Sequence, residues 1–409
     1  MSRYTVRHNV SGMGTRPGME PAMDLTGGWS PQVWLGAPAP GGLALPAATP
    51  SMSWMYSPRG VLLGADHVVV ADSGNHRVLI WHGIPDHDEQ PADVVLGQPD
   101  GTTEGRAAGG RGPEAGMHLP TGVLICDGRL IVADAWHHRI LVWDRVPQTD
   151  DVPPDLVLGQ PDASSVAENS GGSCSASSLY WPFGIGMIGS GFWVADTGNR
   201  RVLGWLSGIP EPGQTADVVL GQPDASSHSE NRGTGVGPDT FRWPHALAGT
   251  EEVLLVADAG DHRILGWNRD RDRDRDRPAD ILCGQNDFGT AQEWPYGPHT
   301  ADRFRFPYSV TLDSAGASGT GSTSPLTAMA VADTANNRIL LWDSIPDGVP
   351  AAGADHVLAQ PDFASNGENR WTSVQHDTLC WPYGVSLHGD RLAVADSGNN
   401  RVMIWSRGL

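Results

Sequence analysis

Residues 70–81 read VADSGNHRVLIW, and this phrase decides the fold because the chain repeats it. Each copy keeps Val-Ala-Asp at its start, an Arg in its middle and a Trp at its end. The copies begin at Val70, Val132, Val194, Val256, Val331 and Val394, and they end at Trp81, Trp143, Trp205, Trp267, Trp342 and Trp405. Self-similarity at a fixed, long period is typical of a repeat array or a propeller.

Two other phrases recur in step with the first one. A proline precedes each copy, at Pro58, Pro120, Pro182, Pro244, Pro307 and Pro382. A phrase close to DVVLGQPD follows five of the copies, at residues 93–100, 155–162, 217–224, 280–287 and 355–362. Successive prolines lie 62, 62, 62, 63 and 75 residues apart, and the longest interval contains a Gly/Ser/Thr-rich insertion around residues 314–324.

Each repeat unit predicts four short strands. In the second unit, residues 120–125, 130–134, 139–143 and 155–159 are rich in Val, Ile, Leu and Trp, and Gly, Pro, Asn and Asp separate them. Four antiparallel strands per unit, repeated six times, make a six-bladed β-propeller, which is an all-β fold.

The two ends of the chain are predicted to share one blade. The sixth unit ends after its third strand, so its fourth phrase is missing. Residues 30–39 (SPQVWLGAPA) resemble residues 91–100 (PADVVLGQPD) of the first unit. We therefore expect the N-terminal strand to be the outer strand of blade six, which closes the ring and removes an open edge. Residues 1–29 form a tail in this interpretation, and residues 30–409 form a single propeller.

The motifs resemble the NHL-repeat family of propellers. The residues that carry the resemblance are ADSGNHRV (71–78), ADTGNRRV (195–202) and ADSGNNRV (395–402), each behind a strand that opens Pro-x-Gly. The resemblance implies a propeller over residues 30–409. It does not fix a function, because one fold serves many functions.

Composition excludes several classes of function. Asp and Glu outnumber the basic residues 47 to 27, for a net charge of −20, whereas nucleic acids and anionic membranes need a basic face. Every basic residue is Arg, which excludes a lysine Schiff base or a P-loop lysine. We find no signal peptide, no membrane-spanning run and no clustered cysteines, and we expect a cytoplasmic protein with reduced thiols.

Residues shared by all six units are interpreted as scaffold. The aspartates of the phrase are expected to accept backbone N–H groups of the turn that follows them. The arginines are expected to bond to those carboxylates, and the terminal tryptophans to pack between blades. Because a binding site is asymmetric, its residues are expected where one unit departs from the others.

Two positions of the repeat are predicted to surround the channel mouth. The residue after the motif proline is Arg59, Thr121, Phe183, His245, Tyr308 or Tyr383, and the residue two before it is Tyr56, His118, Tyr180, Arg242, Arg305 or Cys380. The mouth therefore presents Arg, His and Tyr together in one interpretation. In the other, these side chains pack beneath the crossover loops.

Blade two departs most strongly, because Trp136-His137 replaces the usual Gly-Asn of its turn. With His118 and His245, His137 would supply three neutral imidazoles and leave one position open, which suits Zn²⁺ or another divalent metal. The alternative is that His137 makes the hydrogen bond that Asn makes in other blades, while His118 caps a loop. A further turn position, shared by His76, His138 and His262, is expected at the surface.

A weaker resemblance links the chain to the peptidyl-hydroxyglycine lyase branch of the NHL family. Those propellers hold zinc with three His at the channel mouth, and a Pro-His-Ser/Asp-Leu/Ile motif opens their inner strands. Residues 243–247 (WPHAL) are similar to one such motif. Only His245 carries over, since Tyr383 stands at the corresponding position of blade six and neither His118 nor His137 lies at a matching motif position.

Two functional hypotheses follow from these patterns. The first is a metal-assisted lyase or hydrolase, with zinc as its cofactor, that acts on a small molecule or peptide. Its catalytic residues would be His245, Tyr308 and Tyr383, its substrate-binding residues Arg59, Arg242 and Arg305, and its metal ligands His118, His137 and His245. The second is a non-catalytic disc whose loop face binds a peptide, glycan or protein.

Overall fold

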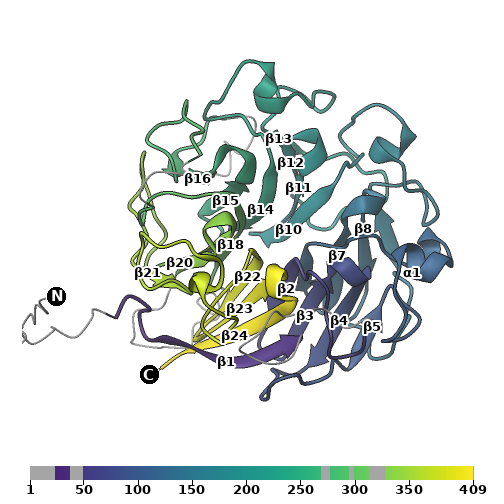
Figure 1. Cartoon of the computed structure of the whole chain (residues 1–409). Helices are drawn as coiled ribbons and strands as arrows, with labels where there is room; N and C mark the ends of the chain where they lie inside the picture. Colours follow the sequence, from purple (N-terminus) through teal and green to yellow (C-terminus); the bar gives the residue numbers. More distant parts are fainter. Residues whose placement is uncertain (1–23, 37–48, 269–276, 294–298, 314–327, 409) are drawn as a thin grey trace, which may run out of the picture.

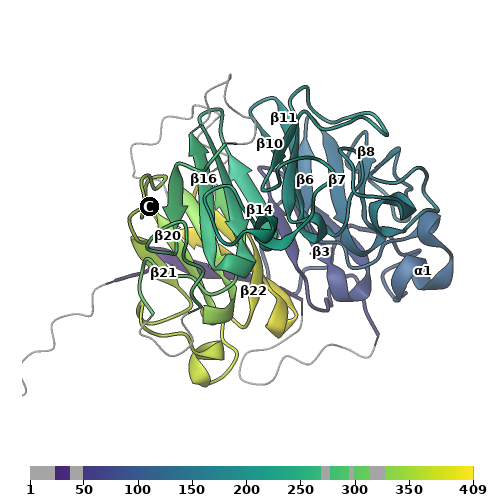
Figure 2. The ribbon, with the colours of Figure 1, turned by 90° about the horizontal axis from the view of Figure 1, so that it is seen from above.

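A computed structural model describes residues 24–36, 49–268, 277–293, 299–313 and 328–408. These residues form six four-stranded antiparallel sheets arranged around an axis, which Figure 1 shows end-on. Figure 2 shows the same disc from the side. The arrangement confirms the six-bladed β-propeller. Among the described residues, no helix is long and apolar enough to cross a membrane.

Each blade begins with a strand at the axis and ends with a strand at the rim. Blade one contains β2 (Gly60–Leu63), β3 (His67–Asp72), β4 (Arg77–His82) and β5 (Val94–Leu96). Blade two contains β6 (Val123–Cys126), β7 (Arg129–Asp134), β8 (Arg139–Trp143) and β9 (Leu156–Leu158). Blade three contains β10 (Pro182–Ile188), β11 (Gly191–Asp196), β12 (Arg201–Trp205) and β13 (Val218–Leu220).

The remaining blades follow the same order, except that the last one takes its rim strand from the start of the chain. Blade four contains β14 (Pro244–Gly249), β15 (Val253–Asp258), β16 (Arg263–Asn268) and β17 (Ile281–Cys283). Blade five contains β18 (Pro307–Leu312), β19 (Met329–Asp333), β20 (Arg338–Trp342) and β21 (His356–Leu358). Blade six contains β22 (Pro382–His388), β23 (Arg391–Asp396), β24 (Arg401–Arg407) and β1 (Trp29–Gly36).

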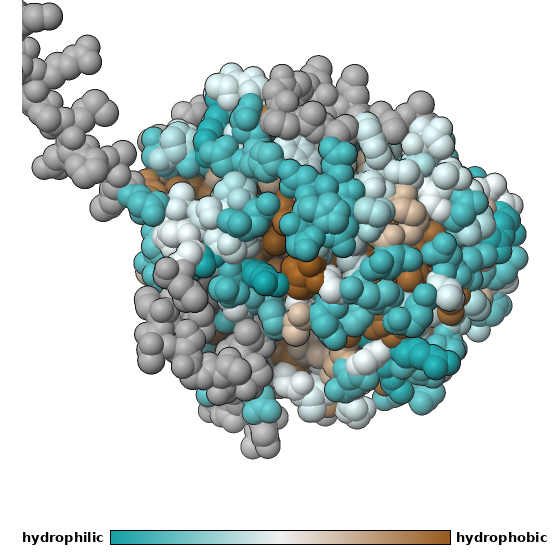
Figure 3. Space-filling view, turned by 90° about the horizontal axis from the view of Figure 1, so that it is seen from below, coloured by the Kyte–Doolittle hydropathy of each residue, from teal (hydrophilic) through white to brown (hydrophobic). Residues whose placement is uncertain are grey.

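Short helical turns lie on one face of the disc, which we call the loop face. A 3-10 turn joins the second and third strands of every blade: Ser73–Asn75, Ala135–His137, Thr197–Asn199, Ala259–Asp261, Thr334–Asn336 and Ser397–Asn399. The crossovers between blades contain α1 (Arg106–Gly110) and the 3-10 turns Pro113–Ala115, Glu168–Gly171, Glu230–Gly233 and Glu368–Trp371. The hydrophobic core lies between neighbouring blades, and the disc edge in Figure 3 is largely hydrophilic with small apolar patches.

Strand β1 closes the ring, as the sequence predicts. It pairs antiparallel with β24, with Trp34 opposite Met403, in the sheet order β1-β24-β23-β22. The Trp34 ring packs on the Arg401 guanidinium, 3.9 Å from its centroid, and only 2% of Trp34 is exposed. The backbone carbonyl of Trp34 also accepts a hydrogen bond from the Glu89 N–H of blade one at 2.7 Å, so β1 ties both sides of the seam.

A fully buried Asp–Arg pair lies at the centre of every blade. The Arg Nε lies 2.6–3.1 Å from an Asp Oδ2 in all six copies, which confirms the predicted pairing. In blades one to five the other guanidinium N–H groups donate to backbone carbonyls of two different crossovers, whereas in blade six Arg401 donates only to the entering crossover and its Nη1 is buried without a hydrogen-bond partner. In blade three, Arg201 Nη1 donates to Ala225 at 2.6 Å and Nη2 donates to Ser175 at 2.7 Å. In blades one to five the pair therefore fixes both the loop that enters its blade and the loop that leaves it.

The aspartates differ from expectation in one respect. Their Oδ1 atoms do not accept N–H groups of the following turn but the N–H of the residue two before the motif proline, as from Tyr180 to Asp196 at 2.7 Å. This bond recurs in all six blades at 2.7–3.0 Å. The carboxylate thus positions the start of the inner strand, beside the channel.

A second repeated contact links each blade to the next. The last turn residue, His or Asn, accepts a hydrogen bond from the N–H of the residue before the next motif proline, as from Trp181 to His138 Nδ1 at 3.2 Å. The same contact occurs at His76, His262, Asn337 and Asn400. The expected surface role of these histidines is therefore wrong, and His262 is only 3% exposed.

Blade three shows why this contact needs an acceptor. Its turn ends in Arg200, and a guanidinium cannot accept a hydrogen bond. The Trp243 N–H donates to Asp258 Oδ1 instead, at 3.0 Å. In the other five blades the donor residue has a left-handed φ of 48–53°, whereas Trp243 is not among the residues with positive φ. This hydrogen bond between blades therefore holds the donor residue in a strained backbone conformation.

The turn of blade four contains a second carboxylate beside the Asp–Arg pair. Where other blades have an Asn that donates to the aspartate, as Asn199 does to Asp196 at 2.8 Å, blade four has Asp261. Asp261 Oδ2 is buried without a hydrogen-bond partner and lies 3.6 Å from Arg263 Nη2. Burial, with repulsion from Asp258, raises the pKa of Asp261 to about 7.

Deletion of residues 1–40 tests the ring closure. It removes β1, leaves the outer edge of β24 unpaired and exposes the apolar groups that β1 covers. We expect the protein to aggregate or to melt at a much lower temperature, as measured by sedimentation and thermal unfolding. A peptide of residues 24–40 added in trans should restore part of the loss. An unchanged melting temperature for the deletion would contradict the closure.

Substitution of Asp261→Asn tests the carboxylate pair. The unfolded Asp261 loses its proton near its ordinary pKa of 3.8, and the folded one near 7, so wild type loses stability relative to the variant as pH rises through this window. We expect equal stability at pH 4 and an advantage of roughly 2–4 kcal/mol for the variant at pH 7, constant above it. Urea unfolding at several pH values measures the difference, and a pH-independent difference would contradict it.

Candidate functional site

Side chains from all six blades form a closed ring of stacked groups at the top of the channel, which we call the mouth ring. Its members are Phe183, His245, Tyr308, Tyr383, Arg59 and Trp136. Successive aromatic centroids from Phe183 to Tyr383 lie 4.6, 4.5 and 4.6 Å apart. The Arg59 guanidinium lies 5.2 Å from the Tyr383 centroid and 5.7 Å from that of Trp136, and Trp136 returns to Phe183 at 5.7 Å.

Blade two contributes to the mouth ring from a different place in its repeat. Five members follow the motif proline, but blade two has the small Thr121 there, and its Oγ1 donates to the Phe183 carbonyl at 3.0 Å. Trp136 of the adjoining turn fills the gap. A glycine usually occupies this turn position, and a Cβ on Gly74 would lie 2.6 Å from the Tyr56 ring. The two departures of blade two therefore compensate each other.

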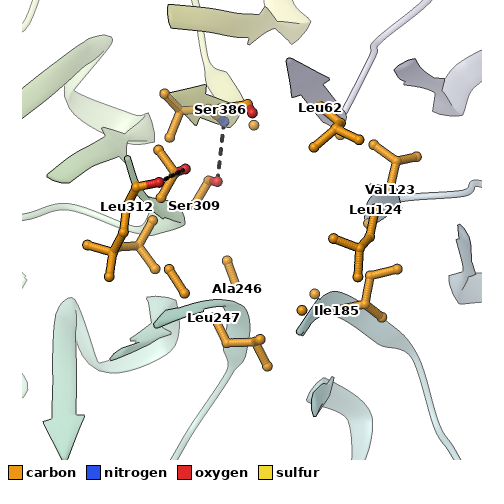
Figure 4. A pocket seen from close by; sticks show the side chains of 18 of the residues that line it. Leu62, Val123, Leu124, Ile185, Ala246, Leu247, Ser309, Leu312 and Ser386 are labelled. Atoms are coloured by element: carbon orange, nitrogen blue, oxygen red, sulfur yellow. Dashed lines mark hydrogen bonds between the residues drawn. The ribbon is translucent and has the colours of Figure 1, made fainter. Parts of the chain in front are cut away.

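An axial cavity of about 530 Å³ extends from the mouth ring along the inner strands. Figure 4 shows Leu62, Leu124 and Ile185 on one side of this cavity, Leu247 at the bottom of the view, and Ser309 and Ser386 on the other side, with Leu312 next to Ser309. The serines also join blades, because Ser309 Oγ accepts the Val385 N–H at 3.2 Å and Ser386 Oγ accepts the Leu63 N–H at 3.0 Å. The channel thus has an apolar wall and a hydroxyl-bearing wall.

Burial keeps two side chains of the mouth ring, His245 and Tyr308, uncharged. It lowers the pKa of His245 to about 4, and the imidazole Nδ1–H donates to the Trp243 carbonyl at 3.2 Å. Burial also raises the pKa of Tyr308 above its usual value, with a smaller contribution from Tyr383. At neutral pH the mouth ring therefore contains an uncharged His245 imidazole and a protonated Tyr308 phenol, together with the Arg59 guanidinium.

The other two arginines expected to bind substrate are paired with carboxylates outside the mouth ring. Arg242 Nε lies 3.3 Å from Glu230 Oε1, and the guanidinium stacks 5.0 Å from the Trp243 centroid. Arg305 Nε lies 2.7 Å from Glu293 Oε1. Their charges are locally balanced, whereas Arg59 has neither an ion pair nor a side-chain hydrogen bond with any described residue.

The predicted metal ligands lie in two separate groups. His118 stacks with His76 and His137 at centroid distances of 5.2 and 5.5 Å, while His245 belongs to the mouth ring. No ring contact in the described part of the chain joins His245 to His118 or His137. His137 Nδ1 bonds to Asp134 Oδ2 at 2.9 Å, which is the contact that Asn makes in other blades.

This arrangement does not fit the predicted three-histidine metal site. Over the described ranges, no group of three or more His, Cys, Asp or Glu side chains is placed to hold one ion. The alternative interpretation of His137, as the substitute for a turn Asn, agrees with its hydrogen bond and its 5% exposure.

Comparison with known proteins gives the repeat its name. The family model of the NHL repeat matches residues 55–81, which cover the inner three strands of blade one. This segment is an NHL repeat. The other five blades resemble this segment because they repeat the same phrase. No curated protein sequence matches the chain.

Solved structures resemble the chain only distantly. Raptor of Chaetomium thermophilum is 12% identical with a TM-score of 0.44, and the match covers 94% of this chain and 29% of that one. Virginiamycin B lyase of Staphylococcus aureus is 10% identical with a TM-score of 0.38, over 86% of this chain and 94% of that one. The chain thus spans less than a third of the Raptor chain, and neither likeness bears on what this propeller binds.

Sequence reasoning placed five mouth-ring members correctly by position but missed the role of Trp136. The signal was available, since the one blade with a small residue after its proline is also the blade with a bulky residue in its turn. Glu230 and Glu293 were also missed. Each lies fourteen residues before its motif proline, as Glu168 and Glu368 do in two other units, so the repetition itself marked this position.

A double-mutant cycle tests the compensation within blade two. Trp136→Gly removes one member of the mouth ring, and Thr121→Tyr alone crowds Trp136, so each change should destabilise the fold by about 1–3 kcal/mol. Together they recreate the pattern of the other blades. We expect the double variant to be at least about 1 kcal/mol more stable than the sum predicts, by urea unfolding. Additive effects would show that the two positions are independent.

Proposed function

We propose that this protein is a small-molecule-binding propeller whose ligand occupies the axial channel below the mouth ring. The observation that carries the proposal is the cavity of about 530 Å³ with one apolar and one hydroxyl-bearing wall. Ligand pockets in proteins are typically ~300–1,000 Å³, mostly apolar, with a few placed polar groups. The channel has this size and this distribution of side chains.

The state of the mouth ring favours binding over proton transfer. A general acid or base works best when its pKa lies near the operating pH. Burial moves the pKa of His245 to about 4 and raises that of Tyr308, so both lie away from neutrality. Their rings also stack on both sides, which holds them rigidly but leaves only their edges toward the axis.

The metal-assisted lyase or hydrolase is the less favoured proposal. It needs three imidazoles that converge on one ion with an open position. His137 Nδ1 is committed to Asp134, and His245 is held between Phe183 and Tyr308 in the other group. The donor set therefore does not fit such an ion, and we derive no reaction step through it.

A second candidate is recognition of a larger partner, a peptide, glycan or protein, by the loop face. Exposed aromatic residues favour it: Trp371 is 78% exposed, Tyr56 48% and Trp381 43%. All three belong to segments that precede an inner strand, in blades one and six. Such residues often anchor partners, and Trp371, which lies twelve residues before Tyr383, allows this function to be tested separately from the channel.

Calorimetric titration with octan-1-ol tests the channel. We expect saturable binding with a stoichiometry of about one, because the channel is a single apolar site of suitable size. Ala248→Phe places a ring inside the channel, where Ala248 is a lining residue, and should abolish the binding. Ala364→Phe, at an exposed crossover position, is the matched control and should bind as wild type does. Equal binding by both variants would contradict a channel site.

A further inference from the structure

Arg59 differs from the other arginines near the channel because it has no anionic partner. Its guanidinium lies between the rings of Trp136 and Tyr383, and its Nε is buried without a hydrogen-bond partner. No carboxylate of the described residues forms an ion pair with it. A buried donor left unpaired is unfavourable, and a ligand atom would satisfy it.

The scaffold arginines and the two arginines just outside the mouth ring have carboxylate partners, unlike Arg59. The six scaffold arginines each hold an aspartate at 2.6–3.1 Å. Arg242 and Arg305, which lie just outside the mouth ring, each hold a glutamate. In a chain with a net charge of −20, the unpaired charge of Arg59 at the axis is therefore a local exception.

The channel is electrically polar along its length. Arg59 lies where the inner strands begin, and Glu251 and Asp313 line the cavity where they end. Asp313 Oδ1 accepts the Gly389 N–H at 2.8 Å, which keeps that carboxylate at the channel wall. An anionic group is thus attracted to the mouth ring and repelled from the opposite end, so the charges orient a charged ligand in one direction.

Two other members of the mouth ring, Tyr308 and His245, can assist an anion without competing with it. The Tyr308 phenol keeps its proton, because burial raises its pKa, so it remains a hydrogen-bond donor. His245 is uncharged at neutral pH, and the nearby Arg59 charge helps to keep it so. Two aromatic rings shelter the guanidinium from water, which strengthens a charge-assisted bond.

We propose that Arg59 is the head-group site of the channel and that its ligand is a small carboxylate with an apolar body. The carboxylate bonds to the guanidinium within the mouth ring, and the body lies along the wall formed by Leu62, Leu124, Ile185 and Leu247. This inference rests on the proposed function, since it assumes that the channel binds a small molecule. It adds the chemical class of the ligand and its orientation.

Octanoate and octan-1-ol form a matched pair of probes, since they share a chain length and differ in charge. We expect wild type to bind octanoate about 10–100-fold more tightly than octan-1-ol, the range for a charge-assisted hydrogen bond. Arg59→Gln should reduce octanoate affinity to that of octan-1-ol and leave octan-1-ol binding unchanged. Arg391→Gln, an exposed arginine on the opposite face, is the control and should change neither affinity.

The outcomes separate this inference from the proposed function. Equal affinities of wild type for the two probes would overturn the carboxylate site and leave the channel function standing, whereas binding of neither probe would overturn both. Equal weakening of both probes in Arg59→Gln would show that Arg59 only shapes the channel. If that variant does not fold, the wild type decides: added salt should weaken octanoate binding and spare octan-1-ol, and an equal salt effect contradicts the site.

Discussion

The buried Asp–Arg pair is the interaction on which the rest of this propeller depends. A buried ion pair is favourable only when its remaining hydrogen-bonding groups are satisfied. Here the Arg N–H groups hold carbonyls of two crossovers, and the second Asp oxygen holds the start of the inner strand. In five of the six blades, one pair therefore fixes both crossovers of its blade, and in blade six it fixes the entering one. Six copies give six nearly identical positions beside the axis, so whatever side chain follows the proline is presented in the same place.

This regularity explains how a specific site arises on a symmetric frame. With the backbone fixed by common residues, the six positions after the proline are free to differ, and they provide Arg, Thr, Phe, His and two Tyr. Stacking then binds these unlike side chains into one ring. Where the series contains a small residue, Thr121, a tryptophan from the neighbouring turn completes it. Asymmetry at the mouth is therefore achieved without altering the strands that carry it.

The fold was predictable from sequence because repetition shows which residues are equivalent. The strands, the Asp–Arg pair and the closure by residues 30–36 all follow from that equivalence. The period does not say how far a residue lies from the axis or which atom it faces. His118 and His137 were therefore grouped with His245, although Asp134 draws His137 away from the axis and His76 stacks on His118. By contrast, the repeat did mark the crossover glutamates that pair with Arg242 and Arg305, because they lie at one fixed distance before the motif proline, while Arg59 has no ion pair with any described residue.

The closure of blade six has a consequence for the time at which the protein can fold. Strand β1 is made before every other described strand, and its partner β24 lies some 370 residues later, with Trp34 opposite Met403. At ~5–20 residues per second, the ribosome needs on the order of tens of seconds to deliver that partner. Until then Trp34 and Leu35 have no strand to cover. A nascent chain halted before residue 401 would contain five blades, the first two strands of blade six and an unpaired apolar strand β1. Such a chain could pair wrongly with other nascent chains on the same mRNA.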